Sequence, residues 1–313
     1  MTAPRTILLT GAAGGLGTLM RDLLPPYGYD LRLLDMRPIK RTAGERAADE
    51  RTADERTADA DGAADANTVG REAETGQAGT RRVITADLAD RDALREAVHG
   101  VDAVLHLAGI SVESTFDKIL AANIQGTHNL YEAVREEGVR TGGAPPRVVS
   151  ASSNHAVGFT PRPRGGDPLI PIDTPRRPDT FYGLSKCFGE DLAQLYADRH
   201  GIDTVSVRIG SCFPEPSNVR MLSVWMSPAD GARLFHAALT AGTTGHTVVY
   251  GSSANTRLWW DLAPARALGY EPRDDSEVFA ARLIAEQGEL DPDNPAHAHL
   301  GGAFCTDPPM WPY

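Results

Sequence analysis

The chain has 313 residues, of which 41% are hydrophobic, and its 31 Lys and Arg against 42 Asp and Glu give a formal net charge of −11. That length suits one large α/β domain or a main domain with a smaller lobe, and the acidic balance argues against a nucleic-acid partner. No run reaches the roughly 18 apolar residues of a membrane span, and the first residues lack a signal-peptide pattern, so we expect no membrane partner.

The three cysteines are Cys187, Cys212 and Cys305, and their spacing fits neither a disulfide framework nor a zinc site. We therefore expect a reducing, cytoplasmic location and no bound metal. The net negative charge would repel an anionic ligand, so a site for such a ligand would need its own local cation.

Strands and helices alternate along the first two thirds of the chain. Short apolar runs predict buried strands at residues 6–10, 29–34, 82–85, 103–107, 147–150 and 204–208. Apolar residues at helical spacing predict helices at residues 16–24, 91–98, 116–134 and 181–200. This alternation indicates βαβ units, and therefore an α/β fold with a Rossmann-type, doubly wound parallel sheet.

The regular pattern weakens after residue 208. Proline-rich loops surround a predicted helix near 228–240 and a predicted strand near 247–250. We expect residues 1–208 to form the main domain. Residues 209–313 are expected to form mainly a small C-terminal lobe that is interleaved with the main domain and binds the substrate.

Residues 41–80 interrupt the alternation. The segments ERAAD, ERTAD and ERTAD follow one another from residue 45 to residue 59, and a period of five fits neither a strand nor a helix. Residues 41–80 hold ten acidic residues and five arginines, which is −5 of the net charge of −11. We predict a disordered surface insertion, and an acidic tether for a partner is the alternative.

A glycine-rich turn joins the first predicted strand to the first helix, with glycines at Gly11, Gly14, Gly15 and Gly17 and with Leu16 between the last two. Glycine is needed where the turn is tight, where the backbone approaches a pyrophosphate and where the helix packs closely on the strand. The N–H groups at the start of the helix would then face the phosphates. The turn predicts a dinucleotide site, although an ordinary βα loop is the alternative for such a turn taken alone.

Acidic and small residues follow the next strands in the order that such a site requires. Asp35 lies 18 residues after Gly17, at the end of the second strand, where a carboxylate accepts hydrogen bonds from the adenosine ribose and repels a 2′-phosphate. We therefore predict NAD as the cofactor in preference to NADP. Further residues at the carboxyl ends of strands are expected to line the cofactor: Asp87, Leu88, Leu107, Ala108, Gly109 and Ile110.

A second motif carries the chemistry. Tyr182 and Lys186 are four residues apart on a predicted helix, so the phenol and the ammonium share one helical face. The lysine is expected to favour the phenolate and so to lower the tyrosine pKa. Ser153 follows the fifth strand, and its hydroxyl can hold the reacting oxygen while Tyr182 moves the proton.

Together these motifs resemble the extended short-chain dehydrogenase/reductases. Four segments are similar, more specifically, to the NAD-dependent uronate dehydrogenases: HLAGISVE (106–113), ASSNHAVG (151–158), YGLSKCFGE (182–190) and VRIGSCFPEPSNVRMLS (207–223). The likeness covers nearly the whole chain except residues 41–80.

The resemblance implies oxidation of a hexuronic acid, D-galacturonate or D-glucuronate, at C1 to the aldarolactone and then the aldaric acid. It implies that Tyr182 is the general base, that Lys186 orients the nicotinamide ribose and that Ser153 holds the hydroxyl. Arg220 would hold the substrate carboxylate and Cys212 would line the cofactor, while the sugar contacts would come from Ser111, Asn154, His155 and Ser211. A homo-oligomer is also implied.

Arg220 is the residue on which reasoning from the residues and resemblance agree. An acidic protein that binds a carboxylate needs a local cation, and arginine is suited to bind a carboxylate with two hydrogen bonds.

Two alternative functions stay open. One is a nucleotide-sugar epimerase or dehydratase that keeps NAD bound, and the other is a non-catalytic NAD-sensing or scaffold protein.

Overall fold

The computed structural model describes residues 5–40, 42, 82–291 and 293–306. The insertion predicted over residues 41–80 lies outside the described residues, apart from Thr42. No helix in these described ranges is long and apolar enough to cross a membrane.

A seven-stranded parallel sheet forms the centre of the molecule, in the order β3-β2-β1-β4-β5-β6-β9. The predicted doubly wound α/β sheet is therefore confirmed. The order reverses between β1 and β4, and the crevice at such a switch point is where open α/β sheets bind ligands. The strands are β1 (Thr6–Thr10), β2 (Asp30–Asp35), β3 (Val83–Thr85), β4 (Ala103–His106), β5 (Arg147–Ser153), β6 (Thr204–Ile209) and β9 (His246–Gly251).

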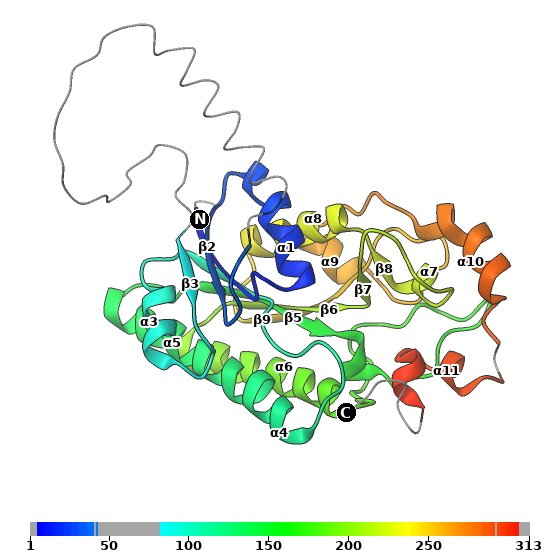
Figure 1. Cartoon of the computed structure of the whole chain (residues 1–313), viewed down its shortest axis with the longest axis horizontal. Helices are drawn as coiled ribbons and strands as arrows, with labels where there is room; N and C mark the ends of the chain where they lie inside the picture. Colours follow the sequence, from blue (N-terminus) through cyan, green and yellow to red (C-terminus); the bar gives the residue numbers. More distant parts are fainter. Residues whose placement is uncertain (1–4, 41, 43–81, 292, 307–313) are drawn as a thin grey trace, which may run out of the picture.

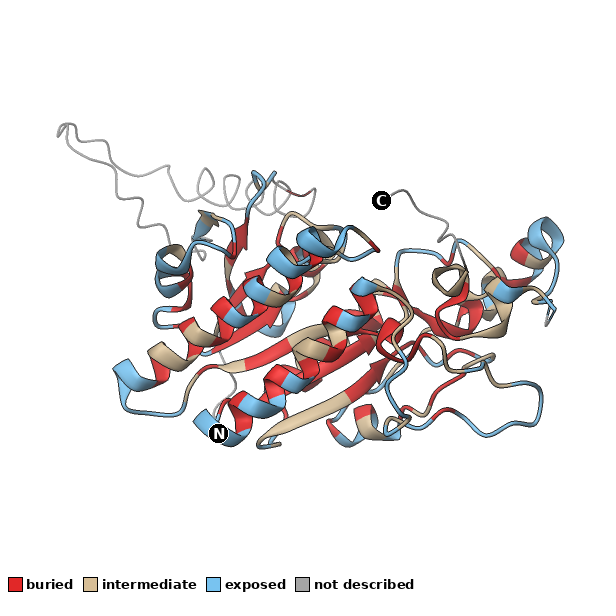
Figure 2. Ribbon diagram, turned by 90° about the horizontal axis from the view of Figure 1, so that it is seen from below, coloured by how far each residue is buried: buried red, intermediate tan, exposed pale blue. Residues whose placement is uncertain are grey.

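Helices cover both faces of the sheet because its strands are apolar on both sides. In β1, Ile7 and Leu9 pack into one core cluster while Leu8 packs into the other. Figure 1 shows one layer with α3 (Arg91–Val98), α5 (Gly126–Thr141) and α6 (Phe181–His200), and the opposite layer with α1 (Gly15–Leu23), α8 (Pro228–Thr240) and α9 (Ala263–Ala267). In Figure 2 the buried residues gather on the strands and on the inner helix faces.

The helix predicted over residues 116–134 differs from the structure. It is divided into α4 (Phe116–Ile119), a π-helical turn (Leu120–Gln125) and α5. The side chain of Asn123, inside this turn, accepts a hydrogen bond from Ile110 N (2.8 Å) and donates one to Ile110 O (2.9 Å). A π turn contains more residues per turn than an α-helix, and the spacing of the apolar residues does not reveal this. The sequence therefore predicted one continuous helix.

Residues 209–313 contribute to the main sheet and also pack beside it. Strand β9 pairs with β6, and α8 packs into the same core cluster as α1. Beyond the carboxyl ends of the strands, a separate apolar cluster surrounds Trp260. The other elements in this part of the chain are β7 (Ser211–Cys212), α7 (Met221–Val224), β8 (Trp225–Met226), α10 (Ala280–Gln287) and α11 (Pro295–Ala298). Across the described residues, 3₁₀ turns are formed by Pro25–Tyr27, Asn154–Val157, Ser276–Phe279 and Gly302–Cys305.

Candidate active site

The glycine turn between β1 and α1 is shaped by contacts that leave no room for side chains. Gly11 has φ +72°, and a Cβ there would lie 2.7 Å from Ala108 N. A Cβ on Gly17 would overlap the carbonyl oxygen of Gly11, whereas a Cβ on Gly15 would meet nothing within 4 Å. Gly11 and Gly17 are therefore required by packing, and the backbone at Gly15 is open to a ligand.

The start of α1 offers its backbone donors to that open space. Gly14 is the N-cap residue, and among the described residues no side chain caps the helix, so the first N–H groups have no side-chain acceptor there. Leu16, in the first turn, packs partly against the core. The free N–H groups at the start of α1, next to the open backbone at Gly15, are suited to bind the pyrophosphate of a dinucleotide.

Asp35 is fixed at the end of β2, next to this turn. Its side chain is buried, and its two carboxylate oxygens accept hydrogen bonds from Ala13 N and from Arg37 N, each at 2.9 Å. The Arg37 side chain is mostly exposed, with Nε 3.4 Å from Asp35 Oδ1. The negative charge that the sequence predicts for the ribose end is thus held rigidly beside the glycine turn.

The other predicted cofactor residues also follow strands at the carboxyl edge. Asp87 is exposed after β3, Leu88 is buried against Gly126, and the run 107–110 follows β4. Cys212 lies in β7, where burial raises the pKa of its thiol to about 12. A thiol of this kind packs as a small apolar group.

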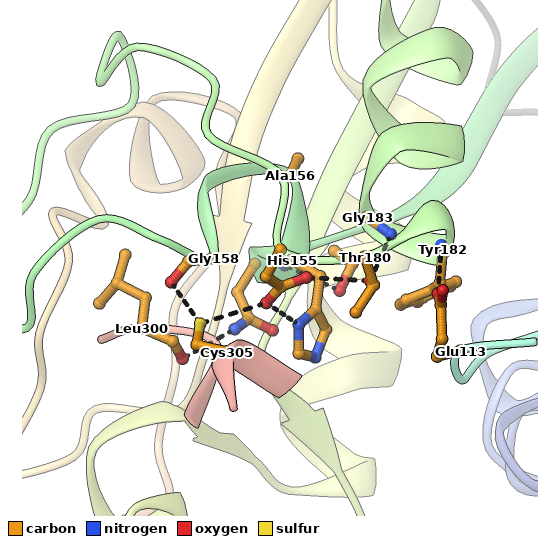
Figure 3. A network of polar contacts seen from close by, with 12 residues as sticks. Glu113, His155, Ala156, Gly158, Thr180, Tyr182, Gly183, Leu300 and Cys305 are labelled. Carbon is orange, nitrogen blue, oxygen red and sulfur yellow. Dashed lines mark hydrogen bonds and ion pairs between the residues drawn. The ribbon is translucent and has the colours of Figure 1, made fainter. Parts of the chain in front are cut away.

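The start of α6 positions Tyr182. Thr180 caps the helix by accepting a hydrogen bond from Gly183 N at 3.0 Å. The buried carboxylate of Glu113 accepts hydrogen bonds from the N–H groups of Phe181 (3.2 Å) and Tyr182 (2.8 Å) (Figure 3). Glu113 was missed as a site residue, although it ends one of the four family-like segments, because nothing in the sequence ties it to a helix about 70 residues later.

Ser153 and Tyr182 are brought together. Ser153 is the last residue of β5 and is buried, and its hydroxyl accepts a hydrogen bond from His155 N at 3.2 Å. Burial raises the pKa of Tyr182 to about 12, and the hydrogen bond with Ser153 lowers it by less than burial raises it. The net direction is opposite to the lowering expected from Lys186, because the desolvation of a buried phenol is the largest contribution.

Lys186 lies one turn further along α6. Its Nζ donates a hydrogen bond to Ala151 O at 2.8 Å and lies 5.4 Å from the centroid of the Tyr182 ring. Burial lowers the pKa of Lys186 to about 8, with Glu190 acting in the opposite direction. Glu190 is itself anchored, since Arg208 donates to both of its oxygens at 2.9 and 2.8 Å. The predicted tyrosine–lysine pair therefore shares one face of a firmly held helix.

Two of the predicted sugar-binding residues hold polar atoms without partners. Asn154 is fully buried, and its Oδ1 has no hydrogen bond to any residue that the structure describes; the same holds for the buried hydroxyl of Ser211. Buried polar groups without a partner are rare in folded proteins and point to a ligand or water. Ser111 is exposed in the loop after β4.

Arg220 is less exposed than a surface arginine. Its Nε donates to Leu300 O at 2.9 Å, and its Nη2 donates to the same oxygen. Burial lowers the pKa of Arg220 to about 10, and Asp179 is the larger of the opposing influences. Because the Leu300 oxygen also accepts from Asn154 Nδ2 (3.1 Å), one backbone carbonyl links the predicted carboxylate anchor to the predicted sugar contacts.

The ring of His155 is enclosed by residues that sequence reasoning missed. Its Nδ1 lies 2.6 Å from Asp179 Oδ2, and its ring stacks on Phe304 with centroids 4.0 Å apart. On its other side the ring meets Tyr182 at 5.7 Å in an edge arrangement. Figure 3 shows His155, Tyr182 and Cys305 near one another, from the turn after β5, the start of α6 and the C-terminal segment. Asp179 and Phe304 lie too far from His155 in the sequence for a local pattern to reveal these contacts.

Comparisons with known proteins agree with this geometry. The model of the NAD dependent epimerase/dehydratase family matches residues 7–225. The chain is 44% identical to a uronate dehydrogenase of Pseudomonas syringae pv. tomato, over 97% of this chain and 94% of the relative. It is 42% identical to a uronate dehydrogenase of Pseudomonas putida, over 97% of each chain.

A solved structure gives the same result. The crystal structure of uronate dehydrogenase from Agrobacterium tumefaciens superposes with a TM-score of 0.78 at 38% identity, over 98% of each chain. The predicted resemblance is thereby confirmed. The chain belongs to the NAD-dependent epimerase/dehydratase family and, within it, to the group of the uronate dehydrogenases.

Proposed function

We propose that this protein is an NAD-dependent dehydrogenase that oxidises hexuronic acids, D-galacturonate or D-glucuronate, at C1. The observation that carries the proposal is the placement of Arg220, which is linked through Leu300 O to Asn154, the residue that follows Ser153. A partly buried arginine gives an acidic protein the local cation that it needs to bind a carboxylate. The relatives named uronate dehydrogenase supply independent support.

The residues present fit NAD. Gly11, Gly14 and Gly17 pack closely within the turn, the backbone at Gly15 is open to a pyrophosphate, and Asp35 would accept hydrogen bonds from the adenosine ribose. Lys186 would orient the nicotinamide ribose. The remaining cofactor contacts would come from Leu16, Asp87, Leu88, Leu107, Ala108, Gly109, Ile110, Tyr182 and Cys212. When bound, NAD supplies the acceptor for the hydride that leaves C1.

The chain's own groups would hold the sugar and move the proton. Arg220 would bind the C6 carboxylate, and Ser111, Asn154, His155 and Ser211 would contact the hydroxyls. Ser153 would orient the C1 hydroxyl and Tyr182 would take its proton. Loss of this proton together with the C1 hydride, which NAD would accept, would give the aldarolactone. Residues 1–208 would then hold NAD. Residues 209–313 would hold mainly the sugar, interleaved through β9 and α8.

The decisive assay follows NADH absorbance with purified protein, NAD and a panel of galacturonate, glucuronate, their neutral parent sugars and UDP-glucose. We expect reduction of NAD with the uronates and little with the neutral sugars. Turnover of UDP-glucose without net NADH would favour the epimerase alternative, which the named relatives do not favour. NAD binding without any turnover would favour a sensing role.

Two further features belong to the same proposal. All three cysteines are free thiols, which suits a reducing cytoplasm. Apolar side chains exposed along α4, the π turn and α6 would suit contact between copies of the chain: Phe116, Leu120, Phe181 and Leu184. Size-exclusion chromatography with light scattering tests the homo-oligomer, and a monomer at micromolar concentration would remove it.

A further inference from the structure

The carboxylate of Asp179 is a buried charge in the site that the proposed mechanism leaves unused. Its side chain has no exposed surface, and its Oδ2 lies 2.6 Å from Nδ1 of His155. Thr180 Oγ1 donates a hydrogen bond to its Oδ1 at 3.0 Å, and the Cys305 thiol is a donor to its Oδ2 with Sγ at 3.8 Å. Among the described residues, the side chains that form hydrogen bonds with this carboxylate, those of His155, Thr180 and Cys305, can all act as donors. The Cys305 thiol can instead donate to Gly158 O, which lies 3.3 Å from its Sγ.

Three glycines leave the space that this carboxylate fills. A Cβ on Gly158 or on Gly301 would overlap Asp179 Oδ2, and a Cβ on Gly183 would lie 2.9 Å from Oδ1. The three glycines come from the turn after β5, the C-terminal segment and α6. Backbone from three directions thus holds the carboxylate in one position, with room for an aspartate or asparagine but not for a longer side chain.

The direction of the His155 hydrogen bond follows from this setting. A carboxylate only accepts hydrogen bonds, so Nδ1 of His155 must be the donor. In a neutral imidazole the other nitrogen then carries a lone pair. Nε2 of His155 has no hydrogen bond to any residue within the described ranges, and the atom is not fully enclosed by protein. It is therefore open to a ligand.

We propose that Asp179 is a positioning residue that keeps the proton of His155 on Nδ1, so that Nε2 accepts a hydrogen bond from a hydroxyl of the sugar. The role of the sugar rests on the proposed function, whereas the position of the proton does not. Stacking on Phe304 fixes the plane of the ring, and the hydrogen bond to Asp179 fixes its rotation. Such a pair selects ligands with a donor at this point.

Asp179→Asn is the most informative variant because the amide fits the same space. Thr180 donates to the Oδ1 position, which keeps the amide oxygen there and turns the NH₂ group toward His155. An NH₂ group donates, so Nδ1 must become an acceptor and the proton moves to Nε2. The variant should therefore reverse the tautomer without changing the volume of the side chain.

The first test is nitrogen-15 NMR of protein labelled at histidine, at the pH of the activity assay. His155→Gln assigns the signals of His155 by their loss. We expect protonated Nδ1 and unprotonated Nε2 in the unsubstituted protein and the reverse in Asp179→Asn. Protonation at Nε2 in the unsubstituted protein overturns the proposal. This result needs neither turnover nor a folded variant at position 179, so it stands even if uronates are not substrates.

The second test is a double-mutant cycle on kcat/KM for the uronate that the protein oxidises. Asp179→Asn and His155→Gln should each lower kcat/KM about tenfold, mainly through KM, because one hydrogen bond to the sugar is lost. The double variant should be no worse than either single variant. Effects that multiply in the double variant would show that Asp179 acts independently of His155 and would overturn the proposal.

Asp203→Asn is the matched control. Asp203 precedes β6 at the opposite edge of the sheet and accepts a hydrogen bond from Gly245 N at 2.7 Å. The same chemical change at that position should leave kcat/KM and the His155 signals unchanged. Equal losses in both variants would mean that the Asp179 effect is a general consequence of replacing a hydrogen-bonded carboxylate by an amide, and the positioning role would be rejected.

Discussion

The carboxyl edge of the sheet has two halves that are built differently. The glycine-turn half (Gly11–Gly17 with Asp35) is made of residues that are close in the sequence, and its connecting hydrogen bond, from Ala13 N to Asp35, spans 22 residues. The arginine half (Asn154, His155, Asp179, Arg220 and the carbonyl of Leu300) is joined by a hydrogen bond that spans 146 residues. One half uses short-range backbone geometry, and the other uses side chains collected from distant segments.

This difference explains which changes each half tolerates. The glycine-turn half depends on the absence of side chains, so an added methyl group disturbs it. The arginine half depends on side chains that meet at one backbone oxygen, so a removed side chain disturbs it. The variants below test whether the two halves can be impaired separately.

Tyr182→Phe should have the largest effect. Loss of the phenol removes the proposed base, and general base catalysis contributes about 10²–10⁴-fold, so kcat should fall by that factor. Tyr182 belongs to neither half and is only one of many proposed cofactor contacts, so NAD affinity measured by fluorescence titration should stay within about twofold of the unsubstituted value. Turnover at more than about a tenth of the original rate would exclude Tyr182 as the base.

Arg220→Ala should impair the arginine half alone. A charge-assisted hydrogen bond contributes on the order of 1.5–3 kcal/mol, so KM for the uronate should rise about 10–150-fold while NAD affinity is kept. Arg282→Ala is the matched control, because Arg282 is exposed on α10 and paired with Glu215 at 3.1 Å. An unchanged KM in Arg220→Ala would show that the carboxylate is bound elsewhere.

The pH profile should reflect the chemistry that lies between the two halves. With the pKa of Tyr182 raised to about 12, its phenolate fraction grows about tenfold per pH unit, so kcat/KM should rise with pH. With the pKa of Lys186 lowered to about 8, its positive charge is lost above that pH, and the two trends should then cancel. We expect a rise below about pH 8 and a plateau above it.

Arg220→Ala serves as the control for this profile. It should lower kcat/KM at every pH and leave the break near pH 8 in place, because Arg220 is outside the proton-transfer pair. A profile that is flat from pH 6 to about pH 8 would contradict the assignment of Tyr182 as a base with a raised pKa.

A pair of glycine variants should give the smallest effects and the sharpest contrast. In Gly17→Ala the methyl group overlaps Gly11 O, so the free energy of unfolding should fall by about 1–3 kcal/mol. In Gly15→Ala the methyl group meets nothing within 4 Å, so Tm should not fall while NAD binds more weakly. Thermal unfolding with and without NAD measures both, and equal Tm losses would refute the distinction.

The sequence predicted the parallel sheet, the glycine turn and the Tyr182–Lys186 pair, because each has a local pattern. The predicted strands agree with the structure to within a few residues, although β5 extends to Ser153. Local pattern could not reveal the π turn around Asn123, since a tertiary pairing with Ile110 accompanies it. It also could not give the net upward direction of the Tyr182 pKa, which depends on burial.

The site residues that reasoning missed share a cause. Leu300 contributes a backbone carbonyl, which every residue has, and Asp179 is held in place by three glycines on separate segments. Glu113 contacts the start of α6 from a loop almost 70 residues earlier. Such contributions become visible only when the fold has placed the segments together.

The single oxygen shared by Asn154 and Arg220 has a consequence for the order in which the protein folds. Closing a short loop costs less conformational entropy than closing a long one, and N-terminal segments emerge first during synthesis. The bond from Ala13 to Asp35 can therefore form early, whereas the bond from Asn154 to Leu300 must wait for residues near the end of the described chain. We expect the proposed nucleotide site of a nascent chain to form before its proposed sugar site.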